Sequence, residues 1–282
     1  MSGKAPELVA EDIRQAIPDG SRKVSDREIE VAVRKAAGDV NLGAFASRSK
    51  VEPVIRDGQA TLRRLIQHSP INDEYELLES SPIRLNDDPA EDARTFMDQL
   101  FWPGELIFTG ERYDRGVLGR TIRTRTEWCE RYTQGEKPAP FLIINPLDGQ
   151  QGQTKGGNGT TMRGDGNVAA FRFCMAEFDN LSIIDQIRFW SVVKLPIMAL
   201  VHSGGKSIHA WIDIWNMRDV LTSDEWNREI RLGLYEKYLI PLGVDRACSN
   251  PARLARMPGH FRTEKNEYQR LLWLSPDGRT IT

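Results

Sequence analysis

The sequence predicts an α+β protein in which a small helical N-terminal region precedes a domain built around an antiparallel sheet. Residues 1–92 are polar, with apolar residues at helical spacing. From Ala93 onward the chain is richer in aromatic residues and contains short β-branched runs bounded by glycine turns. We therefore divide the chain into a helical region with a linker, residues 1–92, and one folded domain, residues 93–282.

Bulk composition narrows the class of protein. The 282 residues are 40% hydrophobic and carry 38 basic against 40 acidic side chains, for a net charge of -2. No run approaches the ~18 apolar residues of a membrane span, and the N-terminus lacks the apolar core of a secretory signal. Cys129, Cys174 and Cys248 are too scattered for a disulfide framework or a zinc ribbon, which favours a reducing cytoplasm. Nucleic-acid binding, if present, has to come from local basic patches.

Two helices are predicted in the N-terminal region. Ser25 and Glu28 form a capping box, and the apolar stripe that follows ends near Gly38. A second helix is expected over Gly58 to His68. The acidic stretch from Glu79 to Asp92 has the composition of a linker or a long surface loop.

In the second part, elements alternate in a regular order. Phe141 to Asn145 is predicted to be a buried strand, and Gln150 to Gly166 is a glycine-rich loop that is either a disordered connector or a substrate-contacting loop. The following segments read as strand, helix, strand, turn, strand, helix and final strand: Val168–Phe178, Leu181–Val193, Ile197–Val201, Ser203–Gly205, Ser207–Ile214, a helix from Ser223 to Gly233 or Leu239, and Tyr268–Leu274.

A pair of acids ends the first of these strands. Because side chains alternate along a strand, Glu177 and Asp179 should leave one face while Phe178 enters the core. Two close carboxylates repel each other unless a cation lies between them, and Mg²⁺ or Mn²⁺ prefers such oxygen ligands. The alternative is an exposed strand end with two solvated acids.

A second group surrounds the glycine turn. Ser207 and His209 share one face of the returning strand, with Lys206 at its entrance. A hydroxyl, an imidazole, an ammonium and turn amides together suit a phosphate chain. A P-loop is excluded because Leu200 stands where that motif needs glycine and a strand follows. Taken alone, His209 is better explained as a hydrogen-bonded core residue.

A third group is arginine-rich. After Asp245 the chain carries Arg246, Arg253, Arg256 and Arg262 and no acid. Guanidinium groups match phosphate oxygens well, and the prolines of this stretch exclude a continuous helix. A solvated basic loop is the alternative.

Together these groups resemble the three-motif signature of the archaeo-eukaryotic primase superfamily, in particular the primase-polymerases of phages, plasmids and mobile elements. The resemblance rests on Glu-x-Asp, Ser-x-His, and an Asp followed by Asn-Pro-x-Arg-Leu-x-Arg-x-Pro-Gly, and it covers residues 167–274. It implies an RRM-like catalytic module within residues 93–282 and a nucleotidyl transferase that uses two metal ions.

The resemblance also implies roles for individual residues. Glu177, Asp179 and Asp245 would hold Mg²⁺ or Mn²⁺, whereas Lys206, Ser207, His209, Arg253 and Arg256 would contact the incoming nucleoside triphosphate. Single-stranded or primed DNA would be the template, with a separate helicase as a further partner, because the sequence contains no Walker A motif. The scattered cysteines depart from relatives that carry a zinc module.

Two other functions are compatible with part of this pattern. A replication initiator could keep the scaffold and bind nucleotide or DNA without catalysis, and a metal-dependent nuclease would also need acids beside basic residues. A template track is expected along Arg112, Arg115, Arg120, Arg123 and Arg125 and the glycine-rich loop, with Tyr113 and Trp128 stacking on bases. A charged surface hairpin is the alternative for that segment.

Overall fold

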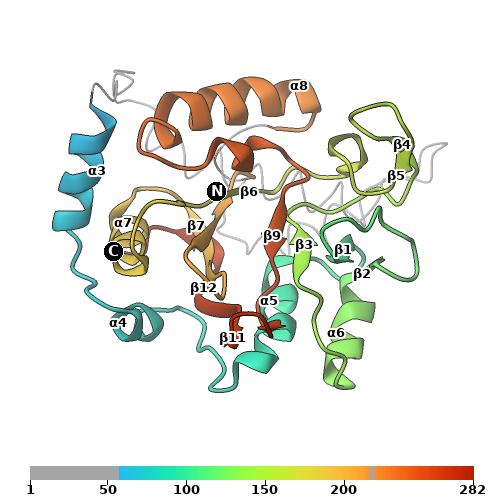
Figure 1. Cartoon of the computed structure of the whole chain (residues 1–282), viewed down its shortest axis with the longest axis horizontal. Helices are drawn as coiled ribbons and strands as arrows, with labels where there is room; N and C mark the ends of the chain where they lie inside the picture. Colours follow the sequence, from blue (N-terminus) through green and yellow to red (C-terminus); the bar gives the residue numbers. More distant parts are fainter. Residues whose placement is uncertain (1–56, 216, 218–219) are drawn as a thin grey trace, which may run out of the picture. The chain divides into compact units, whose positions relative to one another are not determined.

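A four-stranded antiparallel sheet with the strand order β12-β7-β8-β6 organises the chain (Figure 1). Its strands are β6 (Phe173–Ala176), β7 (Ile197–His202), β8 (Ile208–Asp213) and β12 (Arg270–Arg279). All of β6 and β8 is buried, because helices or a second sheet cover both faces. Mixed helices and antiparallel strands confirm the predicted α+β class.

The computed structural model describes residues 57–215, 217 and 220–282, which belong to one unit, Val54–Thr282. The helix predicted to begin at Ser25 lies outside the described residues. Within the described part of the chain, no helix combines the length and the apolar character that crossing a membrane requires.

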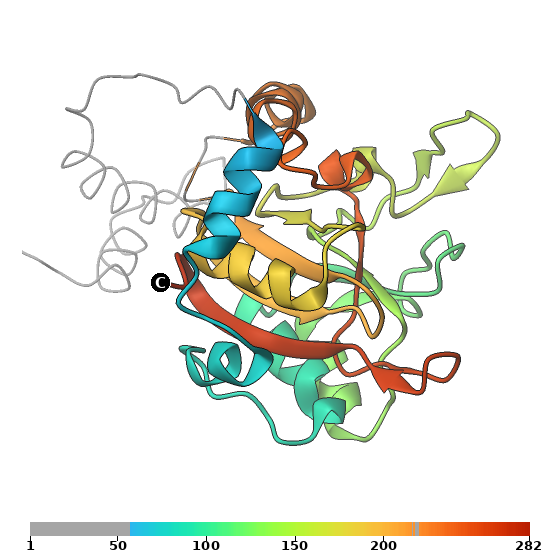
Figure 2. The same cartoon turned by 60° about the vertical axis from the view of Figure 1, so that its left-hand side comes forward.

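Helix α7 (Ile183–Val192) follows β6 and begins at Ser182, whose hydroxyl accepts the Asp185 amide at 3.1 Å. Its aromatic residues Phe189 and Trp190 pack against Phe178, with ring centroids 5.0 and 5.6 Å away. Helix α3 (Gly58–Gln67) packs against α7 (Figure 2). Both helices were predicted from the sequence and are confirmed.

The other face of the sheet contacts α5 (Asp92–Leu100). Trp211 of β8 is fully buried there, with its ring centroid 4.9 Å from that of Phe96 and 5.7 Å from that of Phe173. Edge-to-face aromatic contacts of this kind add to the burial energy of the rings. His209 is two residues before Trp211, so the same face of β8 runs from this aromatic core toward the arginine-rich segment.

A second antiparallel sheet has the order β2-β1-β3-β9. It combines β1 (Leu106–Gly110), β2 (Ile122–Thr124) and β3 (Phe141–Ile143) with β9 (Leu254–Arg256) from the arginine-rich segment. Beside it, α6 (Arg125–Thr133) buries Trp128, whose indole nitrogen donates to the Ile107 carbonyl at 2.9 Å. The strand β3 was predicted from the sequence but this pairing was not, because β3 and β9 lie about a hundred residues apart in the chain.

Asn145 connects the two sheets. Its amide nitrogen donates to the carbonyls of Phe173 and Pro251, both at 2.9 Å, and its amide oxygen accepts the backbone N–H groups of Arg172 and Phe173. A buried amide with all these partners fixes the start of β6 against the segment that leads into β9. The residues that follow both segments form the site described below.

The remaining elements are short or lie at the edges. Helix α8 (Ser223–Glu225) continues as the π-type winding η3 (Trp226–Leu239), which matches the predicted helix from Ser223 to Leu239. The others are α4 (Glu74–Glu79), η1 (Pro89–Glu91), β4 (Gly152–Gln153), β5 (Thr160–Thr161), η2 (Asp165–Asn167), η4 (Arg246–Ser249), β10 (Phe261–Arg262) and β11 (Glu267–Tyr268).

The stretch predicted to be a linker packs on the large sheet. Ile83 donates its amide to the Leu274 carbonyl at 3.2 Å, and α4 and α5 both contact β12. Residues 57–92 therefore contribute to the core around the sheet. The division between residues 92 and 93 stays a prediction.

Candidate active site

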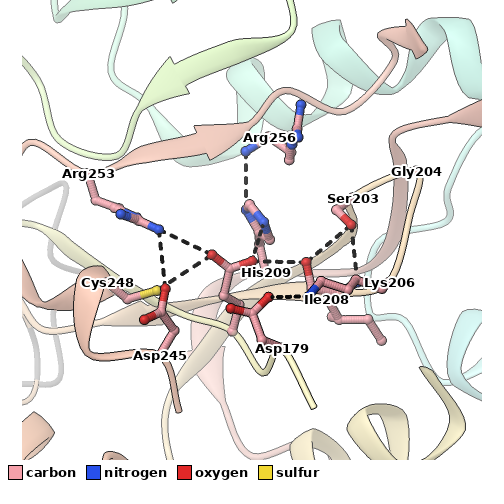
Figure 3. Close-up of polar contacts among 12 residues, drawn as sticks. Asp179, Ser203, Gly204, Lys206, Ile208, His209, Asp245, Cys248, Arg253 and Arg256 are labelled. Atoms are coloured by element: carbon pink, nitrogen blue, oxygen red, sulfur yellow. Dashed lines mark hydrogen bonds and ion pairs between the residues drawn. The ribbon is translucent and has the colours of Figure 1, made fainter. Parts of the chain in front are cut away.

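A cleft of about 810 Å³ opens beside the large sheet. The end of β6, the glycine turn and β8 line it from the large sheet, and Phe141 of β3 and Leu254 and Arg256 of β9 line it from the small one. Seven of the eight predicted site residues line the cleft: Glu177, Asp179, Lys206, Ser207, His209, Arg253 and Arg256. Figure 3 shows their polar contacts.

Strand register explains why Glu177 reaches His209. Ala176, the last residue of β6, pairs with Ala210, so the residue that follows β6 stands opposite His209. One Glu177 oxygen accepts the Ser207 hydroxyl at 2.9 Å and lies 3.0 Å from Nε2 of His209. Phe178 points into the core with 1% of its surface exposed, as strand alternation predicted.

The other Glu177 oxygen faces the arginine-rich segment. It lies 3.3 Å from a terminal nitrogen of Arg253 and 3.8 Å from the sulfur of Cys248 (Figure 3). The two oxygens of Glu177 thus have four polar partners, and 13% of the side chain is exposed. Glu177 is a structural anchor of the cleft wall as well as an acid within it.

The proton on His209 can be assigned from its partners. Nδ1 accepts the backbone N–H of Arg256 at 3.1 Å, so this nitrogen carries no proton. Nε2 therefore carries the proton and donates to Glu177. The imidazole is neutral in this arrangement, and it connects β8 to β9 across the cleft floor.

Opposing effects act on the Glu177 carboxyl. Burial by itself raises its pKa, but the hydrogen bonds donated by His209 and Ser207, together with the charge of the Arg253 guanidinium, outweigh burial and hold the pKa far below its usual range. Glu177 is consequently ionised at every pH at which the protein would work. A permanently charged carboxylate in a half-enclosed wall attracts cations.

Asp179 lies at the rim of the cleft. It is 49% exposed, and one oxygen is 3.1 Å from the ammonium of Lys206, which is 71% exposed. The two carboxylates therefore have separate partners, although they are two residues apart. The sequence placed them on one face but did not predict this separation.

The turn that carries Lys206 is closed by Arg262. Gly204 has φ +63, and a Cβ there would approach the Arg262 side chain and the Tyr268 carbonyl at 3.0 and 3.1 Å. The Arg262 guanidinium donates to the carbonyls of Ser203 and Gly204 at 3.1 and 3.2 Å. Glycine at position 204 thus lets the Arg262 side chain reach the cleft.

Asp245 lies behind the cleft wall. Its backbone N–H donates to the Glu177 carbonyl at 2.9 Å, and one carboxylate oxygen caps η4 through the Ala247 amide at 3.0 Å. The other oxygen is 3.7 Å from Arg253. It is the one predicted site residue that does not line the cleft.

The donor set fits a hard divalent cation in part. Ligand atoms of Glu177, Asp245 and Cys248 lie within 4.8 Å of one another. Burial raises the pKa of the Cys248 thiol well above its usual range, so the sulfur stays protonated and does not suit Mg²⁺ or Mn²⁺. Glu177 and Asp245 remain as oxygen ligands, whereas Asp179 would have to leave Lys206 to join them.

Four further cations line the cleft in addition to the residues predicted to bind the nucleotide: Arg112, Arg163, Arg262 and Lys265. With Lys206, Arg253 and Arg256 they give seven basic side chains against Glu177 and Asp179. Such a concentration of positive charge on a chain of net charge -2 favours the binding of an anion. The sequence shows that Arg163 and Arg262 are charged, but it does not show where they lie. The location of Arg262 depends on its contacts with the turn at Ser203 and Gly204, and that of Arg163 on the hairpin that β4 and β5 form within the glycine-rich loop.

The expected template track is only partly exposed. Trp128 is 4% exposed, so its predicted stacking on bases is wrong. Arg125 pairs with Asp98 at 2.5 Å, and Arg120 lies 3.6 Å from Asp114. Tyr113 is 86% exposed beside Arg112, which keeps the first part of the track available.

No protein-family model matches the chain, and no curated protein does. A search of solved structures finds the archaeo-eukaryotic primase domain of the primase-polymerase of cyanophage S-2L, with a TM-score of 0.41 and 13% sequence identity. The match covers 68% of this chain and 93% of that domain. Function is therefore inferred below from the residues of the cleft.

Proposed function

We propose that this protein is a template-dependent nucleotidyl transferase, a primase-polymerase that joins nucleoside triphosphates on single-stranded or primed DNA. One observation carries the proposal: the ionised Glu177, beside Asp245, borders a cleft with seven basic side chains. Acids that gather a divalent cation and cations that gather phosphates are the two requirements of phosphoryl transfer.

In this proposal the chain's own residues bind and orient the substrate. Arg253, Arg256 and Lys206 neutralise the triphosphate, and the Ser207 hydroxyl and neutral His209 fix Glu177. Glu177, Asp179 and Asp245 would hold Mg²⁺ or Mn²⁺, which activates the attacking 3′-oxygen and stabilises charge on the pyrophosphate leaving group. No side chain has to act as the nucleophile.

Its test is incorporation of labelled nucleotide on a single-stranded template with Mg²⁺ or Mn²⁺, with and without a primer. Extension that requires template and metal supports the proposal, and products without primer identify priming. Shortening of the labelled template, with no incorporation, would instead indicate a nuclease.

A second function is favoured by one observation. Glu177 already has four polar partners, so the wall is stable without any cation. A nucleotide- or DNA-binding module without catalysis would have this property. Nucleoside triphosphate binding that is equally strong with and without divalent cation, together with no incorporation, would select this function.

A further inference from the structure

The Arg253 guanidinium lies close to both acids, Glu177 and Asp245. One terminal nitrogen is 3.3 Å from a Glu177 oxygen and 3.7 Å from an Asp245 oxygen. A single positive group so placed reduces the repulsion between two carboxylates whose ligand atoms come within 4.8 Å of each other. A divalent cation shared by the same two acids would do the same and more strongly.

The Arg253 side chain is incompletely satisfied in this position. Its Nε–H is buried and has no hydrogen-bond partner among the residues that the structure describes. A buried donor without a partner destabilises the conformation that contains it. The side chain is 26% exposed and lines the cleft, so other positions for the guanidinium are within reach.

In contrast to the side chain, the backbone around Arg253 is held by hydrogen bonds. Its carbonyl accepts the Ile144 amide at 3.1 Å, and the next residue begins β9 and pairs with Ile143. Asn145 holds the Pro251 carbonyl at 2.9 Å. Any movement is therefore a rotation of the Arg253 side chain about a fixed Cα, from the acids toward the cleft.

We propose that Arg253 is an exchangeable counter-charge: it holds Glu177 and Asp245 together before a divalent cation binds, and then turns into the cleft to contact the triphosphate. This inference rests on the proposed use of a metal by these acids. It predicts that metal and nucleotide bind cooperatively, since the cation releases the guanidinium that the phosphates need. By reciprocity the nucleotide then raises the affinity for the metal by the same factor.

The experiment titrates the whole chain with Mn²⁺ in the absence of nucleotide. Electron paramagnetic resonance measures the free Mn²⁺ at each step and so gives the affinity. Arg253→Gln removes the competing charge and should tighten Mn²⁺ binding by roughly tenfold, whereas Arg253→Lys should stay near the wild type. Arg256→Gln is the matched control, since Arg256 lines the same cleft but its guanidinium stacks on Phe141, with its central carbon 4.4 Å from the ring centroid. Its Mn²⁺ affinity should change little.

A second titration repeats the Mn²⁺ series with a non-hydrolysable nucleoside triphosphate. The nucleotide should raise the Mn²⁺ affinity of the wild type by a clearly larger factor than that of Arg253→Gln. Unchanged or weaker Mn²⁺ binding by a folded Arg253→Gln protein overturns the exchange while leaving the proposed function intact. Absence of Mn²⁺ binding from the wild type and all variants overturns both, and circular dichroism checks the fold in each case.

Discussion

The wall and the rim of the cleft differ although their acids, Glu177 and Asp179, are separated by a single residue in the chain. Glu177, in the wall, is 13% exposed and has four polar partners, which come from the start of β8 and from the arginine-rich segment. Asp179, at the rim, is 49% exposed and has the exposed ammonium of Lys206 beside it. Burial with satisfied hydrogen bonds contributes to folding stability, whereas an exposed ion pair contributes almost none.

This difference separates two effects that mutations at active sites usually mix. Changes in the wall should alter stability and chemistry together, because the same contacts fix the strands and hold the acids. Changes at the rim should alter chemistry alone. Measuring both quantities for matched variants therefore tests whether an acid belongs to the reaction or to the fold.

The largest effect is expected for Glu177→Gln. The amide would turn an NH₂ group toward donors from Ser207, His209 or Arg253, so the free energy of unfolding should fall by roughly 2–3 kcal/mol at neutral pH. For a chain of this size that lowers Tm by roughly 5–10 °C. Incorporation of nucleotide should fall by orders of magnitude.

The pH dependence of that loss has a definite sign. The pKa of Glu177 is held below its usual range in the folded state, so its contribution is present above the ordinary carboxyl pKa and is lost as pH falls. The Tm difference between wild type and Glu177→Gln should shrink from pH 7 toward pH 3. A difference that grows on acidification would contradict this account of the wall.

Asp179→Asn should give nearly the same loss of incorporation with almost no loss of stability. The variant removes one charge from a half-exposed pair, so Tm should stay within about 2 °C. Asp277→Asn, an exposed acid of β12 outside the cleft, is the control and should preserve both quantities. Incorporation at the wild-type rate by Asp179→Asn would remove this residue from the reaction.

Much of the wall could be predicted because strand periodicity is local information. Alternation along the two predicted strands placed Glu177 on the face opposite Phe178 and put Ser207 and His209 on one common face, and the structure brings the three polar residues within hydrogen-bonding distance. The pairing of Asp179 with Lys206 depends on how the chain turns after Ala176. That turn has no periodic signal.

The second sheet shows the same limit at the level of the fold. Pairing of β3 with β9 joins segments about a hundred residues apart, and the arginine-rich segment lacks a regular alternation that would mark a strand. Its Pro251 and Pro258 correctly excluded a helix. What places Arg253 and Arg256 beside the acids is the long-range contact of Asn145 with the Pro251 carbonyl and the neighbouring strand register.

Asp92, a buried acid that does not line the cleft, has a pKa shifted in the direction opposite to that of Glu177. Asp92 is 2% exposed, and burial raises its pKa to about 7, despite the Leu271 amide that donates to it at 2.8 Å. Arg270 lowers this pKa, but by less than burial raises it. Two buried acids thus shift in opposite directions, and the strength of their charged and hydrogen-bonded partners decides the sign.

Asp92→Asn should therefore stabilise the protein above pH 7, by about 1–2 kcal/mol, because the wild type must bury a charge there. Between the ordinary carboxyl pKa and about 7 the folded state binds the extra proton, so wild-type stability falls as pH rises through this window. The variant should lack that slope. Urea unfolding at pH 5 and pH 8 measures it, and equal wild-type stability at both values would count against the burial effect.

The smallest effect is expected outside the cleft, on the loop that carries Tyr113. This loop holds three exposed hydrophobic side chains, Tyr113 at 86%, Val117 at 43% and Leu118 at 53%, and Arg112 connects it to the cleft lining. If template bases stack there, Tyr113→Ala should weaken single-stranded DNA binding about threefold to tenfold, while the slope of log affinity against log salt concentration stays unchanged.

Arg112→Ala should instead reduce that slope by about 0.7, the value for one phosphate contact. Tyr75→Ala, an equally simple change at a 69% exposed tyrosine of α4, is the control for fluorescence anisotropy. Equal binding by the Tyr113 and Tyr75 variants would place the template elsewhere and leave the assignment of the cleft untouched.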